Sequence, residues 1–202
     1  LREIIYDVGN GIKNNKKFKS VQTGGPTGGT LSEADLDIPI DYETLASAGS
    51  MMGSGGMIVL DEDNCMVDIA KFYLGFSKSE SCGKCTPCRI GVSRLYELVD
   101  KISKGEATLE TLNLISELSV TVKRAALCGL GKTAPNNVIS SLSKFKEEYL
   151  EHINENYCRA KVCRDLITYA IQEKSCVRCG ACYKKCPVKA ISGDKKIGYT
   201  ID

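Results

Sequence analysis

Eleven cysteines and a single histidine constrain this chain of 202 residues more than any other feature of its sequence. They fall into three sets by their spacing. The sets are Cys82, Cys85, Cys88 with Cys128; Cys176, Cys179, Cys182 with Cys186; and Cys65, Cys158, Cys163 with His152. Thiolates spaced two or three residues apart converge on one metal ion or one inorganic cluster. We therefore expect the chain to fold around metal centres.

The composition describes an ordinary globular chain, with 43% hydrophobic and 26% charged residues. A net charge of +2 and the lack of a long basic run argue against a nucleic-acid-binding surface. We expect no membrane span, because no apolar stretch approaches the roughly 20 residues that one needs. The odd number of cysteines, their tight spacing and the lack of a secretory signal favour metal sites in a reducing cytoplasm over disulfides.

The hydrophobic pattern divides the chain into an N-terminal mixed part and a helical part, which predicts an α+β fold. In residues 1–60, short β-prone runs at 18–22 and 57–60 and a helical turn at 44–48 alternate with glycine loops at 24–29 and 53–56. We interpret the glycine loops as tight turns, because neither has the spacing of a phosphate-binding loop. The 57–60 run reads as a buried strand.

Residues 61–155 carry four apolar stripes at helical spacing, which predict an antiparallel four-helix bundle. The fourth stripe is expected to start at Pro135 and to run as one helix to Ile153. Residues 156–173 read as a linker with a short helix over 164–172, followed by an incomplete ferredoxin-like piece at 174–202. We expect the chain to be an internal piece of a longer polypeptide.

Cys82, Cys85 and Cys88 precede a helix, and Cys128 follows the third stripe as the natural fourth ligand. This three-plus-one arrangement favours an iron–sulfur cluster over a four-cysteine zinc knot, which more often pairs two Cys-x-x-Cys knuckles. Backbone N–H groups at such a loop can donate hydrogen bonds to the cluster sulfurs.

The run from Glu80 to Gly91, Glu-Ser-Cys-Gly-Lys-Cys-Thr-Pro-Cys-Arg-Ile-Gly, closely resembles the cluster signature of the NADH-binding flavoprotein subunits of complex I, NAD-dependent hydrogenases and formate dehydrogenases. The two glycine loops and Tyr42-Glu43 resemble the same family in the same order. The resemblance implies that residues 1–60 end a β-grasp domain. It also implies that the bundle holds one [4Fe-4S] cluster on Cys82, Cys85, Cys88 and Cys128.

The resemblance further implies that FMN and NAD(H) bind in a preceding domain, outside this sequence. We therefore expect no flavin, nicotinamide or catalytic acid–base residue here. The segment would be an electron relay within an oxidoreductase.

The run Cys176-x-x-Cys179-x-x-Cys182-x-x-x-Cys186-Pro187 matches the bacterial ferredoxin motif. Cys176, Cys179 and Cys182 are expected to bind one [4Fe-4S] cluster. Cys186 is expected to bind a second cluster only if a partner motif exists, because in two-cluster ferredoxins the fourth cysteine binds the other cluster. Truncation, disorder of the second motif or a single-cluster variant would each explain why no such motif follows.

This extension moves the resemblance toward the flavoprotein subunit of a multimeric, electron-bifurcating, NAD-dependent iron-only hydrogenase. The partners implied are the hydrogenase catalytic subunit, a small [2Fe-2S] thioredoxin-like subunit and ferredoxin. A formate dehydrogenase or a complex I-like NADH dehydrogenase is the alternative.

Three cysteines and one histidine form a common structural zinc set. We predict that Cys65, His152, Cys158 and Cys163 bind Zn²⁺ and pin the linker to the bundle. Alternatively, Cys65 is a buried apolar residue and His152 a solvated cation at a helix end, or the set holds a further cluster. A function of another class also stays open, a zinc-stabilised docking module that moves no electrons.

Overall fold

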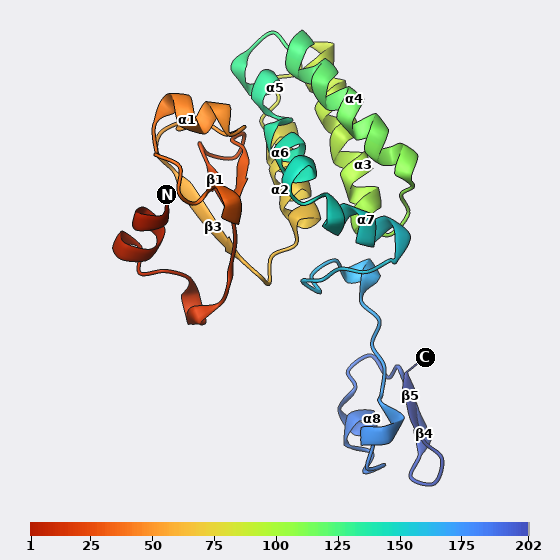
Figure 1. Cartoon of the computed structure of the whole chain (residues 1–202). Helices are drawn as coiled ribbons and strands as arrows, with labels where there is room; N and C mark the ends of the chain where they lie inside the picture. The colour runs from red at the N-terminus through yellow and green to blue at the C-terminus, as the bar shows by residue number, and fades with distance from the viewer. Residues whose placement is uncertain (202) are drawn as a thin grey trace. The chain divides into compact units, whose positions relative to one another are not determined.

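The structure, a computed structural model, describes residues 1–201. Contacts divide the chain into two compact units that meet in sequence at Leu166 and Ile167 (Figure 1). The first unit combines a small sheet with a group of helices, and the second contains two short helical segments and a hairpin. The predicted mixture of helices and strands is confirmed, and no helix in the described residues is long and apolar enough to cross a membrane.

A three-stranded antiparallel sheet forms the N-terminal part, in the order β2-β1-β3. The strands are β1 (Phe18–Thr23), β2 (Thr30–Ser32) and β3 (Met57–Asp61). Val21 of the central strand is fully buried and pairs with Leu31 on one side and Val59 on the other. The helices η1 (Ile4–Val8) and α1 (Tyr42–Ser47) contribute Ile5 and Leu45 to the same core.

Both glycine loops are tight turns, as predicted, and they pack against each other. Gly24 and Gly53 have φ of +82° and +56°, and a Cβ at Gly53 would lie 2.7 Å from the Gly24 Cα. The prediction of a strand at 57–60 is also right, but its burial is wrong. Ile58 and Val59 remain 46% and 37% exposed, because β3 is an edge strand of the sheet.

The helical part begins with α2 (Met66–Ser79), η4 (Pro87–Val92), which continues into α3 (Ser93–Ser103), and α4 (Leu109–Ala125). It ends with α5 (Gly129–Thr133), α6 (Asn136–Lys144) and α7 (Lys146–Asn154). The apolar stripes meet in one core, in which Leu74, Leu95, Ile102, Ile115 and Val138 are each 0% exposed.

The single fourth helix expected from Pro135 to Ile153 is wrong. The chain breaks at Phe145, whose φ of −128° and ψ of 32° are not helical, and α6 and α7 lie on either side. After the break, Glu148, Tyr149 and His152 of α7 are all buried. Glu148 and His152 contact residues at the start of α2. Burying these three side chains requires an α7 direction that a straight continuation of α6 would not give.

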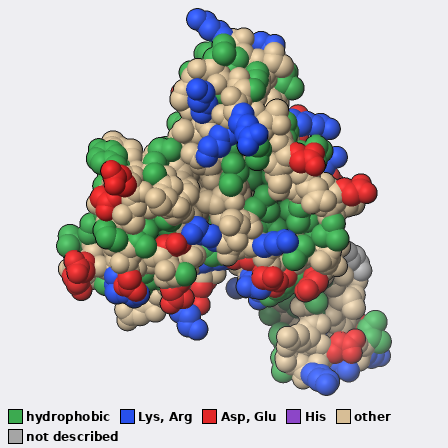
Figure 2. Space-filling model, turned by 45° about the horizontal axis from the view of Figure 1, so that its top comes forward, with side chains coloured by type: hydrophobic (Ala, Val, Ile, Leu, Met, Phe, Trp, Pro, Cys, Tyr) green, Lys and Arg blue, Asp and Glu red, His purple; other side chains and the backbone are tan. Residues whose placement is uncertain are grey.

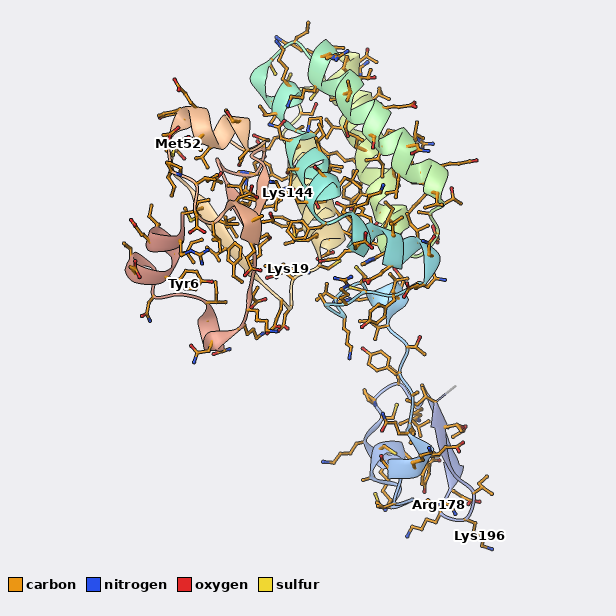
Figure 3. The ribbon with its side chains drawn as sticks, viewed as in Figure 1. Tyr6, Lys19, Met52, Lys144, Arg178 and Lys196 are labelled. Atoms are coloured by element: carbon orange, nitrogen blue, oxygen red, sulfur yellow. The ribbon has the colours of Figure 1, made fainter. Side chains whose placement is uncertain are left out.

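Polar contacts hold the sheet against the helices (Figure 3). The Lys19 ammonium lies 2.6 Å from the Glu148 carboxylate of α7, and Lys144 of α6 lies 2.7 Å from Asp35. The backbone N–H of Thr30 donates to the Ser140 hydroxyl at 2.8 Å. These contacts join residues more than 100 positions apart, so they fix the sheet on the helices.

The second unit contains η6 (Glu173–Ser175), α8 (Ala181–Lys185) and the hairpin β4 (Ile191–Asp194) with β5 (Gly198–Ile201). Tyr199 of β5 packs under the cysteine loop, where a Cβ at Gly180 would lie 2.6 Å from its hydroxyl. The short helix expected over 164–172 is wrong in extent, because only η5 (Arg164–Leu166) is helical there.

Candidate iron–sulfur and metal centres

The first cysteine set lies on two loops that meet at one end of the helices. Cys82 and Cys85 belong to the loop between α2 and η4, and Cys88 lies in the first turn of η4, after Pro87 at its first position. Cys128 precedes α5 as its N-cap residue. A Cβ at Gly131 of α5 would lie 3.5 Å from the Cys88 sulfur, so α5 approaches that ligand closely.

Backbone N–H groups donate to the Cys85 sulfur of this set. The N–H groups of Leu127 and Cys88 donate to the Cys85 sulfur, and they lower the pKa of its thiol. Leu127 immediately precedes Cys128, so this contact joins the two loops. An environment that favours thiolate over thiol suits a ligand of iron, because the thiolate is the form that binds metal.

One hydroxyl is directed at the most buried ligand of this set. Ser81 Oγ lies 3.3 Å from the Cys88 sulfur, and it accepts the N–H of Gly83 at 3.4 Å. Because the oxygen already accepts from Gly83, its own hydrogen is free to point at the sulfur. Cys88 is only 4% exposed, whereas Cys82 and Cys128 are exposed.

The close approach of Gly131, the loop N–H groups and the three-plus-one thiols fit an iron–sulfur cluster. A different arrangement holds Cys65, His152, Cys158 and Cys163, whose ligand atoms all lie within 4.8 Å of one another.

The third set converges in a buried site. Cys65, His152, Cys158 and Cys163 are 1%, 1%, 2% and 4% exposed. The His152 Nε2 lies 3.3 Å from the Cys65 sulfur and 3.4 Å from the Cys163 sulfur, and these two sulfurs are 3.7 Å apart. A zinc ion bound at about 2.3 Å by sulfur and about 2.0 Å by nitrogen places tetrahedral ligand atoms roughly 3.5–3.8 Å apart. The four side chains therefore fit one tetrahedral ion.

The His152 ring is oriented for metal binding. Its Nδ1 lies 2.6 Å from the Glu148 carbonyl oxygen, which makes Nδ1 the hydrogen-bearing nitrogen and leaves Nε2 to face the sulfurs. The His152 side chain is only 1% exposed, which rules out the alternative that His152 is a solvated cation at a helix end.

Two groups of this set hold their protons more tightly than they would in water. Burial lowers the pKa of His152, but its hydrogen bond with Cys65 outweighs this and raises the pKa to about 9. The hydrogen bond to the Cys65 sulfur, together with burial, raises the pKa of Cys158 to about 12. A divalent cation reverses this balance, since its charge favours the deprotonated ligands.

A buried ion pair supports two of these ligands. One carboxylate oxygen of Glu148 pairs with Lys19, and the other accepts the N–H of Met66 at 3.1 Å. Met66 follows Cys65, and Glu148 lies one helical turn before His152. The Glu148 side chain therefore holds the backbones that carry Cys65 and His152 in register.

The set of Cys65, His152, Cys158 and Cys163 lies wholly within residues 1–166. Cys158 and Cys163 occupy the loop after α7, and this loop packs into the helical core. The boundary between the two units falls after Leu166, inside the segment expected as a linker at 156–173.

In the second unit, Cys176, Cys179 and Cys182 lie on the loop that precedes and enters α8, and Cys186 follows its last turn. Burial raises the pKa of Tyr199, and the neighbouring Asp194, Cys182 and Cys179 add to the effect. The Tyr199 ring therefore packs against the cysteine loop, and Gly180 at φ +74° allows the loop backbone to approach it closely.

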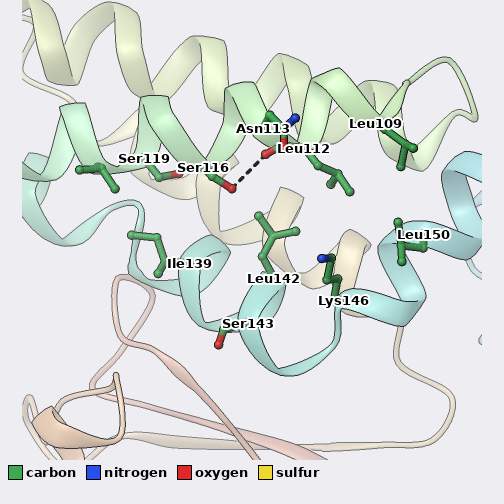
Figure 4. A pocket seen from close by; sticks show the side chains of 11 residues that line it. Leu109, Leu112, Asn113, Ser116, Ser119, Ile139, Leu142, Ser143, Lys146 and Leu150 are labelled. Atoms are coloured by element: carbon green, nitrogen blue, oxygen red, sulfur yellow. Dashed lines mark hydrogen bonds between the residues drawn. The ribbon is translucent and has the colours of Figure 1, made fainter.

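A groove of about 690 Å³ lies between α4 and the α6–α7 pair (Figure 4), and no cysteine, histidine or acidic side chain lines it. Four leucines, Val120 and Ile139 form its apolar lining, and the Ser116 hydroxyl donates to the Leu112 carbonyl oxygen at 3.0 Å. Lys146 is its single ionisable side chain.

Sequence reasoning missed Ser81, Lys19 and Glu148. Ser81 directly precedes Cys82, so its position in the motif could have indicated a hydroxyl close to the cysteine sulfurs. Lys19 and Glu148 are ordinary charged residues in the sequence, and only the fold brings them together.

Comparison with known proteins agrees with this geometry. Residues 68–152 match the family model described as the NADH-ubiquinone oxidoreductase-F iron-sulfur binding region. Residues 169–192 match a 4Fe-4S binding domain, so the F-type iron–sulfur region here is followed by a ferredoxin motif.

Relatives of this F-type region are subunits of oxidoreductases. The chain is 54% identical over 97% of its length to the NADP-reducing hydrogenase subunit HndC of Solidesulfovibrio fructosivorans, and covers 40% of that protein. It is 37% identical over 74% of its length to the F-type subunit of the NADH-quinone oxidoreductase of Aquifex aeolicus, and covers 34% of it. The chain thus spans well under half of the curated relatives it matches.

A solved structure shares the fold. The crystal structure of an NAD⁺-reducing [NiFe]-hydrogenase in its H₂-reduced state matches with a TM-score of 0.65 and 27% identity. The match covers 74% of this chain and 26% of the other.

Proposed function

We propose that this chain is the electron-relay segment of the flavin- and iron–sulfur-containing NAD(H)-oxidoreductase subunit of a multimeric hydrogenase. One observation carries the proposal: the loops of Cys85 and Cys128 meet inside a segment that matches the F-type iron–sulfur region, and a ferredoxin motif follows. The 54% identity to a hydrogenase subunit supports a hydrogenase over a formate dehydrogenase or a complex I-like enzyme.

In this proposal the helices form a four-helix bundle that holds a [4Fe-4S] cluster on Cys82, Cys85, Cys88 and Cys128. Residues 1–60 end a β-grasp domain that supports it. A bound cluster supplies one-electron transfer. The chain itself supplies the thiolates, the loop N–H donors and the partial exclusion of water at Cys88.

The second unit contributes Cys176, Cys179 and Cys182 to a further [4Fe-4S] cluster, and Cys186 to another when a partner motif is present. FMN and NAD(H) belong to the parent subunit, outside this segment. The proposed setting is a cytoplasmic, electron-bifurcating hydrogenase with a catalytic subunit, a small [2Fe-2S] thioredoxin-like subunit and ferredoxin as partners.

Zn²⁺ on Cys65, His152, Cys158 and Cys163 has a structural role in this proposal. It joins the start of α2, the end of α7 and the following loop, and so fixes the last segment of the first unit on the helices. Because zinc has no redox chemistry, this site fixes geometry and carries no electron.

The test is EPR spectroscopy of the dithionite-reduced full-length subunit, compared with a Cys85→Ala variant. We expect the variant to lose one [4Fe-4S] signal and its iron while it keeps the signals from the second unit. Unaltered spectra would remove Cys85 as a ligand. A subunit that binds zinc alone would instead support the docking-module alternative.

A further inference from the structure

Charge is distributed unevenly between the two units. Residues 167–202 contain seven Lys and Arg against three Asp and Glu, a net charge of +4. Residues 1–166 hold the remaining 20 basic and 22 acidic residues, a net charge of −2. The basic residues of the second unit are Lys174, Arg178, Lys184, Lys185, Lys189, Lys195 and Lys196.

These basic side chains are all exposed, and none forms an ion pair within the described residues 167–201. Asp194 is the nearest carboxylate to the hairpin turn, but its Oδ1 accepts the backbone N–H groups of Lys196 and Ile197 at 2.6 and 3.0 Å. Turn formation therefore occupies this carboxylate, and the lysine ammonium groups stay available.

Three of the cations lie together with two exposed apolar residues. The Arg178 Nη1 donates to the Lys196 carbonyl oxygen at 2.7 Å, which joins the cysteine loop to the hairpin turn (Figure 3). Val177 and Ile197 are 83% and 79% exposed beside them. We name this set, Val177, Arg178, Lys195, Lys196 and Ile197, the basic end. The smaller lobe in Figure 2 shows basic, hydrophobic and acidic side chains close together.

Arg178 has an unusual backbone conformation. Its φ of +54° lies in the left-handed region, which glycine and asparagine adopt far more readily than arginine. It stands between Cys176 and Cys179 in the sequence, and its Nη1 is held at the Lys196 carbonyl oxygen.

We propose that the basic end is a docking surface for a small acidic electron-carrier protein. The proposal rests on the proposed iron–sulfur role of Cys176 and Cys179, because a carrier must dock beside the loop that holds the redox centre. Exposed Val177 and Ile197 supply the apolar centre that a transient interface needs, and the cations around them steer an acidic partner. Interfaces of this class are small and weak, which agrees with a surface of five residues.

Charge complementarity favours an acidic protein over other polyanions. Nucleic acid binding by phosphate neutralisation needs an extended basic surface, whereas the whole chain has a net charge of only +2. Anionic membranes and single-stranded DNA are retained as outcomes of the test.

The experiment measures association of the full-length, anaerobically purified subunit with an acidic two-[4Fe-4S] ferredoxin. A Lys195→Glu/Lys196→Glu variant should associate about tenfold more slowly at low ionic strength, with a smaller deficit as salt is added. A Lys13→Glu/Lys101→Glu variant is the matched control, because it changes the net charge equally at two exposed lysines of the first unit. The control should associate within twofold of the unaltered subunit.

Equal losses in the two variants would overturn the proposal. So would unchanged ferredoxin association accompanied by weaker binding of phosphatidylglycerol vesicles or single-stranded DNA. Iron content and the EPR spectrum of the unaltered subunit test the proposed function separately. A subunit without iron removes that function, whereas normal iron with unchanged ferredoxin association removes only the docking surface.

Discussion

At Cys88 a single hydroxyl hydrogen bond is expected to influence the bundle cluster. Ser81 is placed to donate to the Cys88 sulfur, and such a bond stabilises the more negative, reduced state. A Ser81→Ala variant should therefore shift the reduction potential to more negative values. A differential bond of about 1 kcal/mol corresponds to roughly 40 mV for one electron.

An EPR-monitored redox titration of the full-length subunit measures this shift. Ser93→Ala is the control, because the Ser93 hydroxyl donates to the Arg89 carbonyl oxygen on an exposed face and not to a sulfur. If the Ser81→Ala variant keeps its iron and has the same reduction potential as the control, the hydroxyl does not influence the potential of the cluster.

The buried Lys19–Glu148 pair is expected to stabilise the zinc site. In a Glu148→Gln variant, the largely buried Lys19 ammonium loses its counter-charge and keeps the Asn64 carbonyl oxygen as a partner, and the support of Cys65 through Met66 is weakened. We expect a loss of about 3 kcal/mol in the free energy of unfolding and faster release of zinc to a chelator. Urea denaturation and chelator kinetics measure the two effects.

A Lys19→Met/Glu148→Gln variant provides the comparison, because it removes the isolated charge. Its loss of stability should be smaller than the sum of the two single losses, since the partners are in contact. Additive losses would show that the pair does not act as a unit.

Among the secondary-structure elements, the short helix α5 requires glycine at one position and not at another. A Cβ at Gly131 would lie 2.6 Å from the Ala126 Cβ and 3.1 Å from the Cys88 Cβ, whereas a Cβ at Gly129 meets nothing within 4 Å. Gly131→Ala should displace α5 together with Cys128 and cost about 1–3 kcal/mol. The bundle cluster should lose iron while the second unit keeps its own.

Gly129→Ala is the matched control, and it should leave the iron content and the EPR signals unchanged. Equal iron in the two variants would show that α5 does not position the fourth ligand.

Much of the element structure could be predicted from the sequence, because local pattern determines it. The apolar residues of α2, α3 and α4 recur at helical spacing, and Gly24 and Gly53 occupy turns that need positive φ. The convergence of Cys65 with His152 was also predictable from ligand chemistry.

The remaining features depend on contacts between distant residues. The break at Phe145 follows no glycine or proline, and it is set by the burial of Glu148 and His152 at the start of α2. The exposure of Ile58 depends on which strand lies at the sheet edge, and an apolar run does not encode this. The partnership of Lys19 with Glu148 is likewise invisible without the fold.

At the scale of the whole molecule, the division at Leu166 and Ile167 predicts where a protease cleaves the chain. Residues 167–172 have no regular structure, and Tyr169 is 73% exposed. Limited chymotrypsin digestion of the zinc-loaded chain should cleave first after Tyr169. The larger fragment should retain the zinc, because all four ligands precede the cut. Zinc that leaves with the smaller fragment would contradict this assignment.

In the function proposed for it, the chain holds iron–sulfur clusters for electron transfer beside one structural zinc. The most direct test is the amount of iron, acid-labile sulfide and zinc per chain after anaerobic purification. We expect about eight irons with equal sulfide when both the Cys82 and the Cys176 sets are filled, and one zinc. Zinc without iron and sulfide would contradict it.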